Sequence, residues 1–195
     1  MTNIDLFELR RELLHILVGI IFFLLVLFVP YSKFLLFGLL IIGGAASFLS
    51  VSFKVPIVNR FLCLFERECN KQFPGKGLIF FFLGSLLALQ LFSREIALAS
   101  ILILVFSDPI SHFVGKNFGG TIKINKKYFE GTLVGILAGT IFASFFIPFY
   151  IALIGAFFAM FLEIIEVSMA GKSIDDNLLI PLVAGTAMHF ATSLL

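Results

Sequence analysis

Residues 13–29 read LLHILVGIIFFLLVLFV, an apolar run in which His15 is the only titratable side chain. A helix that crosses a bilayer needs about 20 apolar residues, with about 17 as the lower limit, so this run is long enough. The same bias extends over the whole chain, because 60% of its 195 residues are hydrophobic and only 13% are charged. A soluble core cannot cover that much apolar surface, so lipid must cover it. We therefore predict an integral membrane protein.

Six further apolar runs follow, separated by polar segments, at residues 34–53, 78–92, 96–113, 132–147, 149–165 and 178–194. Together with the first run, they predict an all-α, polytopic transmembrane bundle of about seven spans, with residues 1–195 as a single domain. The opening residues 1–12 mix acidic and basic side chains with leucines at helical spacing. This pattern predicts an interfacial amphipathic helix rather than a cleaved signal peptide.

The basic residues indicate how the bundle is oriented. If the N-terminus is cytoplasmic and all seven runs span the membrane, Lys33 and Arg94 are the only two of the fourteen Lys and Arg that fall outside. Cytoplasmic loops of membrane proteins carry an excess of Lys and Arg. The distribution therefore predicts a multi-pass protein of the cell membrane, with its N-terminus and its two large basic loops in the cytoplasm.

Ionisable residues are concentrated toward the cytoplasmic side of the predicted bundle. Each one costs roughly 2.5–3.5 kcal/mol at the centre of a membrane helix, so it usually has a partner or a function. A small transporter, the alternative from another functional class, would place such residues in both halves of the membrane. The one-sided distribution favours a site that faces the cytoplasm. Its candidate members are His15, Asp108, His112, Glu163, Glu166, Asp175 and Asp176.

The fourth apolar run carries the densest polar pattern. Asp108, His112 and Lys116 are spaced four residues apart and therefore share one helix face. Ser111 and Gly115 lie on the adjacent face, where small residues permit the close approach of another helix or of a ligand. Two interpretations are open: a functional site, or an interhelical ion pair beside a glycine packing seam.

The polar loops add further charge near this run. Lys126 and Lys127 lie just before Gly131, a combination that suits phosphate. Glu130, which lies between Lys127 and Gly131, could hold a divalent cation that bridges phosphates. The alternative for this loop is a basic anchor for anionic lipid head groups. Lys76 lies in a Pro-Gly-Lys-Gly segment before the third run and by itself indicates only a basic turn.

Acidic residues also mark both ends of the loop that connects the last two runs. Asp175, Asp176 and Asn177 precede the seventh run, where short polar side chains are typical of a helix cap. Two adjacent carboxylates repel each other unless a cation or a proton lies between them, so a cation site is the second interpretation. Glu163 and Glu166 share one helix face and either pair with nearby lysines or belong to the same cation site.

Five short motifs occur in order along the chain: Glu8-x-Arg10-Arg11-x3-His15, Pro74-Gly75-Lys76-Gly77, Ser107-Asp108-Pro109 with Gly115 and Gly119, Lys127-x-x-Glu130-Gly131, and Asp175-Asp176-Asn177-x3-Pro181. As an ordered set, they resemble the family of dolichol kinases, phytol kinases and CTP-dependent diacylglycerol kinases (the polyprenol kinase family) over nearly the whole chain. The chain is also distantly similar to phosphatidate cytidylyltransferases. Synthesis of a CDP-lipid from a lipid phosphate is therefore the alternative activity.

The resemblance implies CTP-dependent phosphorylation of a membrane lipid alcohol, either polyprenol- or dolichol-like or a diacylglycerol, at the cytoplasmic membrane face. It implies CTP as the phosphoryl donor, Mg²⁺ or another divalent cation as the cofactor, and the bilayer but no nucleic acid as a partner. Catalysis is assigned to Asp108, His112 and Lys127. Nucleotide binding is assigned to Lys76, Gly115, Lys116, Lys126, Lys127 and Gly131. Metal binding is assigned to Asp108, Glu130, Asp175, Asp176 and Asn177. A further polar role is assigned to His15, Glu163 and Glu166.

Overall fold

The computed structural model describes residues 6–53, 75–120, 122–125, 127–165, 168–169 and 172–194. Within these ranges, seven helices correspond one to one with the seven predicted apolar runs, which confirms the all-α membrane bundle. The helices are α1 (Leu6–Phe28), α2 (Ser32–Phe53), α4 (Lys76–Leu91), α5 (Arg94–Phe118), α6 (Phe129–Ala143), α7 (Phe149–Ile165) and α8 (Asp176–Ser193). Two short antiparallel hairpins were not predicted: β1 (Lys123–Ile124) pairs with β2 (Lys127–Tyr128), and β3 (Ser168–Met169) pairs with β4 (Lys172–Ser173).

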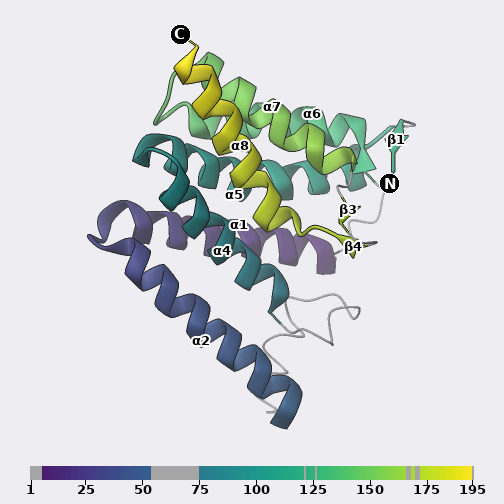
Figure 1. The fold of residues 1–195 in the computed structure, drawn as a ribbon. Helices are drawn as coiled ribbons and strands as arrows, with labels where there is room; N and C mark the ends of the chain where they lie inside the picture. The colour runs from purple at the N-terminus through teal and green to yellow at the C-terminus, as the bar shows by residue number, and fades with distance from the viewer. Residues whose placement is uncertain are drawn as a thin grey trace.

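The chain reverses direction at the two ends of the bundle. The start of α1 and both hairpins lie at one end, which we call the hairpin end, and the α1–α2, α4–α5 and α6–α7 turns lie at the other (Figure 1). At that opposite end, the Arg94 guanidinium donates a hydrogen bond to the Leu27 carbonyl at 2.8 Å, and Lys33 donates one to the Gln90 side chain at 3.3 Å. The two basic residues predicted for the outer side therefore both lie away from the hairpin end.

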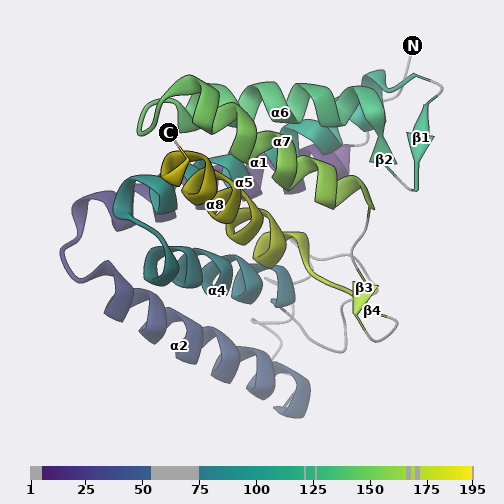
Figure 2. The same cartoon turned by 45° about the horizontal axis from the view of Figure 1, so that its top comes forward.

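Helix α5 forms the centre of the bundle. Helices α1, α4, α6, α7 and α8 all pack against it, whereas α2 lies at the edge and packs mainly along α4 (Figure 1, Figure 2). Residues 96–105 of α5 are all buried, and all are apolar except Ser100. Residues 96–105 therefore lie in the apolar core, and the polar part of α5, from Ser107 onward, extends from the core toward the hairpin end.

Small residues bring α5 and α6 into close contact. A Cβ atom added at Gly135 of α6 would lie only 2.8 Å from the Ser107 carbonyl oxygen and from Ser111 Cβ. One turn closer to the hairpin end, a Cβ atom at Gly131 would lie 2.7 Å from Gly115 Cα. The glycine packing seam, one of the two interpretations of the fourth apolar run, is therefore present, and α6 fills that face of α5.

The helices differ in how well their lengths match a bilayer. Three in the described part of the chain are long and apolar enough to cross one, at Leu9–Phe28, Ser32–Ser50 and Arg94–Phe118. Helices α4, α6 and α7 are apolar but shorter. At a rise of 1.5 Å per residue, the 15 residues of α6 extend over about 22 Å, less than the roughly 30 Å of the hydrocarbon core. Seven complete crossings therefore stay a prediction.

Two helices extend beyond the predicted runs. α1 is continuous from Leu6 to Phe28, so residues 6–12 form the first turns of the helix that carries the first span. Residues 1–5 lie outside the described residues, and an interfacial position for the segment 1–12 stays a prediction. α5 continues through Pro109 to Phe118, so Asp108, His112 and Lys116 do belong to one helix.

Candidate functional site

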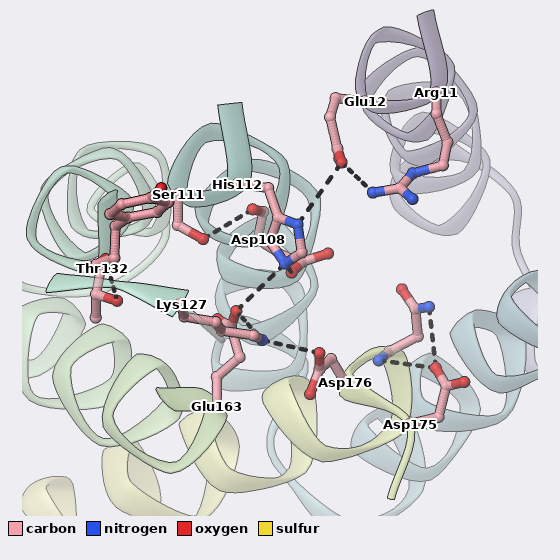
Figure 3. Close-up of polar contacts among 12 residues, drawn as sticks. Arg11, Glu12, Asp108, Ser111, His112, Lys127, Thr132, Glu163, Asp175 and Asp176 are labelled. Atoms are coloured by element: carbon pink, nitrogen blue, oxygen red, sulfur yellow. Dashed lines mark hydrogen bonds and ion pairs between the residues drawn. The ribbon is translucent and has the colours of Figure 1, made fainter. Parts of the chain in front are cut away.

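Polar side chains from several elements meet at the hairpin end (Figure 3). Helix α5 contributes Asp108 and His112, α7 contributes Glu163, β2 contributes Lys127, and the first residue of α8 is Asp176. We call these five residues the polar cluster. The three residues assigned to catalysis from the sequence therefore lie together, and they are joined by Glu163 and by one of the predicted metal ligands.

Lys127 lies between two carboxylates of the polar cluster. Its ammonium contacts the Glu163 carboxylate and donates a hydrogen bond to Asp176 Oδ2 at 3.0 Å. Burial alone would lower the pKa of Lys127, but the Glu163 and Asp176 carboxylates outweigh this effect, so the pKa is raised and the side chain stays charged. Burial also raises the pKa of the Asp176 carboxyl to about 6, against the opposing effect of Lys127.

The β1–β2 hairpin fixes the position of Lys127. Its turn contains Asn125, whose backbone has a positive φ of 55°, a conformation that asparagine tolerates better than most residues. The Asn125 side-chain amide donates a hydrogen bond to the Ile164 carbonyl of α7 at 2.8 Å. On the other side of Lys127, Tyr128 packs against Gly115 of α5. The hairpin is therefore attached to both helices that flank the polar cluster.

Three side chains of the polar cluster present their polar atoms to one another. His112 Nε2 lies 3.5 Å from Asp108 Oδ1 and 3.8 Å from Glu163 Oε1, and one oxygen or nitrogen of each residue lies within 4.8 Å of the other two. On the far side of the imidazole, His112 Nδ1 lies 3.9 Å from Glu12 Oε1, which is held by Arg11 at 2.5 Å. Helix α1 therefore supplies an outer layer to this part of the site.

Several buried polar atoms around the cluster have no hydrogen-bond partner among the described residues. Buried polar groups in proteins are nearly always paired, so such atoms at one place point to a ligand. Glu163 is only 1% exposed, yet its Oε2 atom has no partner. Asp108 Oδ1, His15 Nε2 and Asn177 Oδ1 are also unpaired, and Glu130 Oε2, apart from the cluster, is another such atom. Most of these atoms are carboxylate or amide oxygens, which suit a cation.

The acidic residue before the start of α8, Asp175, caps this helix. Asp175 is the N-cap residue of this helix, and its Oδ1 atom accepts hydrogen bonds from the backbone and side-chain nitrogens of Asn177 at 3.2 and 3.1 Å. Asp175 Oδ2 lies 3.4 Å from the Lys76 ammonium. The helix-cap interpretation is therefore confirmed for Asp175, and Lys76 lies at the edge of the same site.

Other residues assigned from the sequence are not among the five residues of the polar cluster. Glu130 faces Gly120, and no contact joins it to the cluster within the described residues. Lys116 is exposed, one turn beyond His112. Gly115 and Gly131 face each other across the α5–α6 seam, so their contact with a nucleotide stays a prediction. His15 lies near the site with its ring 5.8 Å from that of Phe81. Lys126 and Glu166 lie outside the described residues.

Sequence reasoning missed the role of Arg11 and Glu12. Both were counted as part of an amphipathic surface segment, whereas the continuous α1 helix carries them to the polar cluster (Figure 3). The sequence did contain a signal that Glu12 faces the site. Glu12 precedes His15 by three residues and therefore shares a helix face with it. Glu163 was assigned only a supporting role, but it is the most deeply buried acid of the cluster.

Comparison with known proteins places the chain among relatives of similar length. It is 33% identical over 180 residues to an uncharacterised protein of Methanocaldococcus jannaschii, with 90% of each chain covered. It is also 32% identical over 188 residues to an uncharacterised protein of Rickettsia prowazekii, again with 90% of each covered. The chain belongs to the same family as these two proteins. No protein-family model and no solved structure matches it.

This family has a distant homologue with a named activity. The chain is 29% identical over 207 residues to CTP-dependent diacylglycerol kinase 1 of Schizosaccharomyces pombe, and the similarity covers 93% of the chain and 92% of the kinase. The similarity therefore includes nearly all of both proteins rather than one shared segment. It supports a relationship to lipid kinases, in agreement with the resemblance carried by the five motifs.

Proposed function

We propose that this protein uses CTP to phosphorylate a membrane lipid alcohol, polyprenol- or dolichol-like or a diacylglycerol, at the cytoplasmic face of the cell membrane. The observation that carries the proposal is the contact of Lys127 with Glu163 and Asp176, at one end of an apolar helical bundle. Such a site combines a fixed positive charge with carboxylates, as phosphoryl transfer requires. The similarity to a CTP-dependent diacylglycerol kinase supports the same reaction class.

The residues of the polar cluster suit the chemistry of this reaction. Phosphoryl transfer depends mainly on positioning and on neutralising charge, and Lys127 offers its ammonium to the phosphate oxygens. The lipid hydroxyl oxygen forms a bond to the γ-phosphorus of CTP, the bond from that phosphorus to the β,γ-bridging oxygen breaks, and CDP leaves. The hydroxyl proton passes to Asp108 or to His112, whose polar atoms lie 3.5 Å apart.

A divalent cation, Mg²⁺ by resemblance, would neutralise phosphate charge when bound. The unpaired, buried oxygen of Asp108 fits this role, and Asp176 lies within the same cluster. Asp175 and Asn177 are already engaged in the cap of α8, so their part in metal binding, like that of Glu130, stays a prediction.

The location of the site suits both substrates. The hydroxyl of a membrane lipid lies near the head groups, and CTP is present in the cytoplasm. The elements that carry Lys127, Glu163 and Asp176, which are β2, the last turn of α7 and the first turn of α8, lie at the hairpin end (Figure 1). Lys33 and Arg94 lie at the opposite end, which supports a cytoplasmic hairpin end by the positive-inside rule.

A product assay tests the proposed function. Purified protein in detergent is mixed with Mg²⁺, γ-labelled CTP or ATP, and a panel of polyprenol, dolichol and diacylglycerol, and the organic phase is counted. Label from CTP in the lipid fraction is expected, and the best acceptor identifies the substrate. Release of labelled pyrophosphate with lipid phosphates, and no labelled lipid with any alcohol, would instead identify a cytidylyltransferase.

A further inference from the structure

We infer that Asp108, His112 and Glu163 form a binding site for a divalent transition-metal ion of the Mn²⁺ type. We call these three residues the metal triad. The binding itself follows from the geometry of the triad, whereas the use of the ion in phosphoryl transfer rests on the proposed function. The inference differs from the metal ligands assigned from the sequence, which included Asp108 but not His112, and it adopts for Glu163 the alternative that this residue belongs to the cation site.

The spacing of the triad atoms suits a common ion. Bonds from carboxylate oxygen or imidazole nitrogen to such ions are about 2.0–2.2 Å, so two ligands of one ion lie at most about 4.4 Å apart. His112 Nε2 lies 3.5 Å from Asp108 Oδ1 and 3.8 Å from Glu163 Oε1, within this limit. The triad comes from two helices, α5 and α7, that pack against each other, so its geometry is held by the bundle.

Unpaired atoms and charge give a second, independent indication. Asp108 Oδ1 and Glu163 Oε2 are buried and have no hydrogen-bond partner among the described residues. Asp108, Glu163 and Asp176 together carry three negative charges when ionised. Lys127 contacts this group through Glu163 and Asp176. A cation bound by Asp108 and Glu163 would offset negative charge, which is costly at a buried site.

Glu12 holds His112 in the orientation that a metal ligand needs. Its Oε1 atom lies 3.9 Å from His112 Nδ1, on the side of the ring opposite the triad, and Arg11 fixes that carboxylate at 2.5 Å. With Nδ1 protonated toward Glu12, Nε2 presents its lone pair to an ion held between Asp108 and Glu163. When the ion is bound, His112 has no free nitrogen, so the lipid hydroxyl proton of the proposed function passes to Asp108. Metal-binding histidines usually have such a carboxylate behind them, which fixes the tautomer and the ring orientation. Glu12 is therefore a positioning residue.

The ligand types select the ion. Mg²⁺ prefers oxygen ligands in near-ideal octahedral geometry and keeps several waters. Imidazole nitrogen suits the transition metals, and carboxylate oxygen suits Mn²⁺ as well as Mg²⁺. A set of one histidine and two carboxylates therefore favours Mn²⁺ over Mg²⁺.

A titration of Mn²⁺ into the purified full-length protein in detergent, followed by electron paramagnetic resonance of the free ion, tests the inference. A single high-affinity site that an excess of Mg²⁺ does not empty is expected. His112→Ala should weaken Mn²⁺ binding about tenfold or more, and Glu12→Gln should weaken it less. His189→Ala is the matched control, because His189 is exposed near the opposite end of the bundle and should bind Mn²⁺ as wild type does.

Carboxylate variants make the test independent of His112. Glu163→Gln keeps the shape of the side chain and should also weaken Mn²⁺ binding, whereas Glu95→Gln, at the exposed start of α5, should not. Unchanged binding in both His112→Ala and Glu163→Gln, or displacement of Mn²⁺ by an equal concentration of Mg²⁺, would overturn the inference. A His112-dependent Mn²⁺ site in a protein that labels no lipid would support the inference and contradict the proposed function. A protein that phosphorylates lipid but lacks that Mn²⁺ site would contradict the inference and support the proposed function.

Discussion

Lys127 Nζ lies 3.0 Å from Asp176 Oδ2, and this contact connects the β1–β2 hairpin to the first residue of α8 across 49 positions of sequence. The same ammonium contacts Glu163 at the end of α7. One lysine therefore ties together three elements at the hairpin end, and it does so in a cluster where carboxylates outnumber it.

Replacement of Lys127 by Met should abolish lipid phosphorylation and destabilise the protein. The variant removes the charge offered to phosphate and leaves Glu163 and Asp176 without their cation. Loss of one partner from a buried ion pair costs on the order of 3 kcal/mol. Thermal unfolding in detergent and the lipid-labelling assay measure the two effects. Lys123→Met is the control, because Lys123 is exposed and its ammonium lies over the Tyr128 ring, and little change is expected. A Lys127→Met protein as active as wild type would contradict the role of this lysine.

Replacement of Gly135 by Ala should lower the melting temperature of the protein. The added Cβ would lie 2.8 Å from the Ser107 carbonyl oxygen, so α5 and α6 would have to separate, and such overpacking typically costs about 1–3 kcal/mol. Gly38→Ala in α2 is the matched control, because a Cβ there meets no atom within 4 Å and alanine favours helix. Equal melting temperatures for the two variants would contradict the close α5–α6 seam.

Variants of Asp175 separate its helix-capping role from the predicted role in metal binding. Asp175→Ala removes the acceptor for the Asn177 nitrogens and should destabilise the protein by about 1 kcal/mol, whereas Asp175→Asn keeps a capping oxygen. We expect Asp175→Asn to retain both stability and lipid phosphorylation. A stable Asp175→Asn protein without activity would show instead that the carboxylate charge is needed, as the metal assignment from the sequence requires.

Cysteine labelling tests the predicted orientation. In a background with Cys63 and Cys69 replaced by serine, Lys123→Cys reports on the hairpin end and Lys33→Cys on the opposite end. A membrane-impermeant maleimide should label Lys33→Cys in intact cells and Lys123→Cys only in inverted vesicles. This pattern is expected because Lys33 lies at the end that the positive-inside rule places outside. The reverse pattern would place the polar cluster outside the cell and exclude cytoplasmic CTP as its substrate.

Much of the fold follows from the sequence, because apolar runs of sufficient length form helices and the chain must then alternate between two ends. The four-residue spacing likewise brings Asp108 and His112 together, since neighbours on a helix face are set by the helical period. The contacts of Lys127 were not predictable in this way. They depend on a hairpin with two-residue strands and on the Asn125 turn, neither of which has a periodic signal. The position of Glu130 away from the cluster was not predictable either. It depends on which helices pack against each other, and residue spacing within one helix does not determine that.

The most direct test of the central claim compares phosphoryl transfer by the wild-type protein, Asp108→Asn and Glu95→Gln. Both variants neutralise one acid of α5, but Asp108 lies in the polar cluster and Glu95 lies at the exposed opposite end. With γ-labelled CTP and the preferred lipid alcohol, wild type and Glu95→Gln should label the lipid at similar rates. Asp108→Asn should insert into membranes and elute as a folded protein but should transfer no measurable label. Normal turnover by folded Asp108→Asn would contradict the assignment of the polar cluster as the active site.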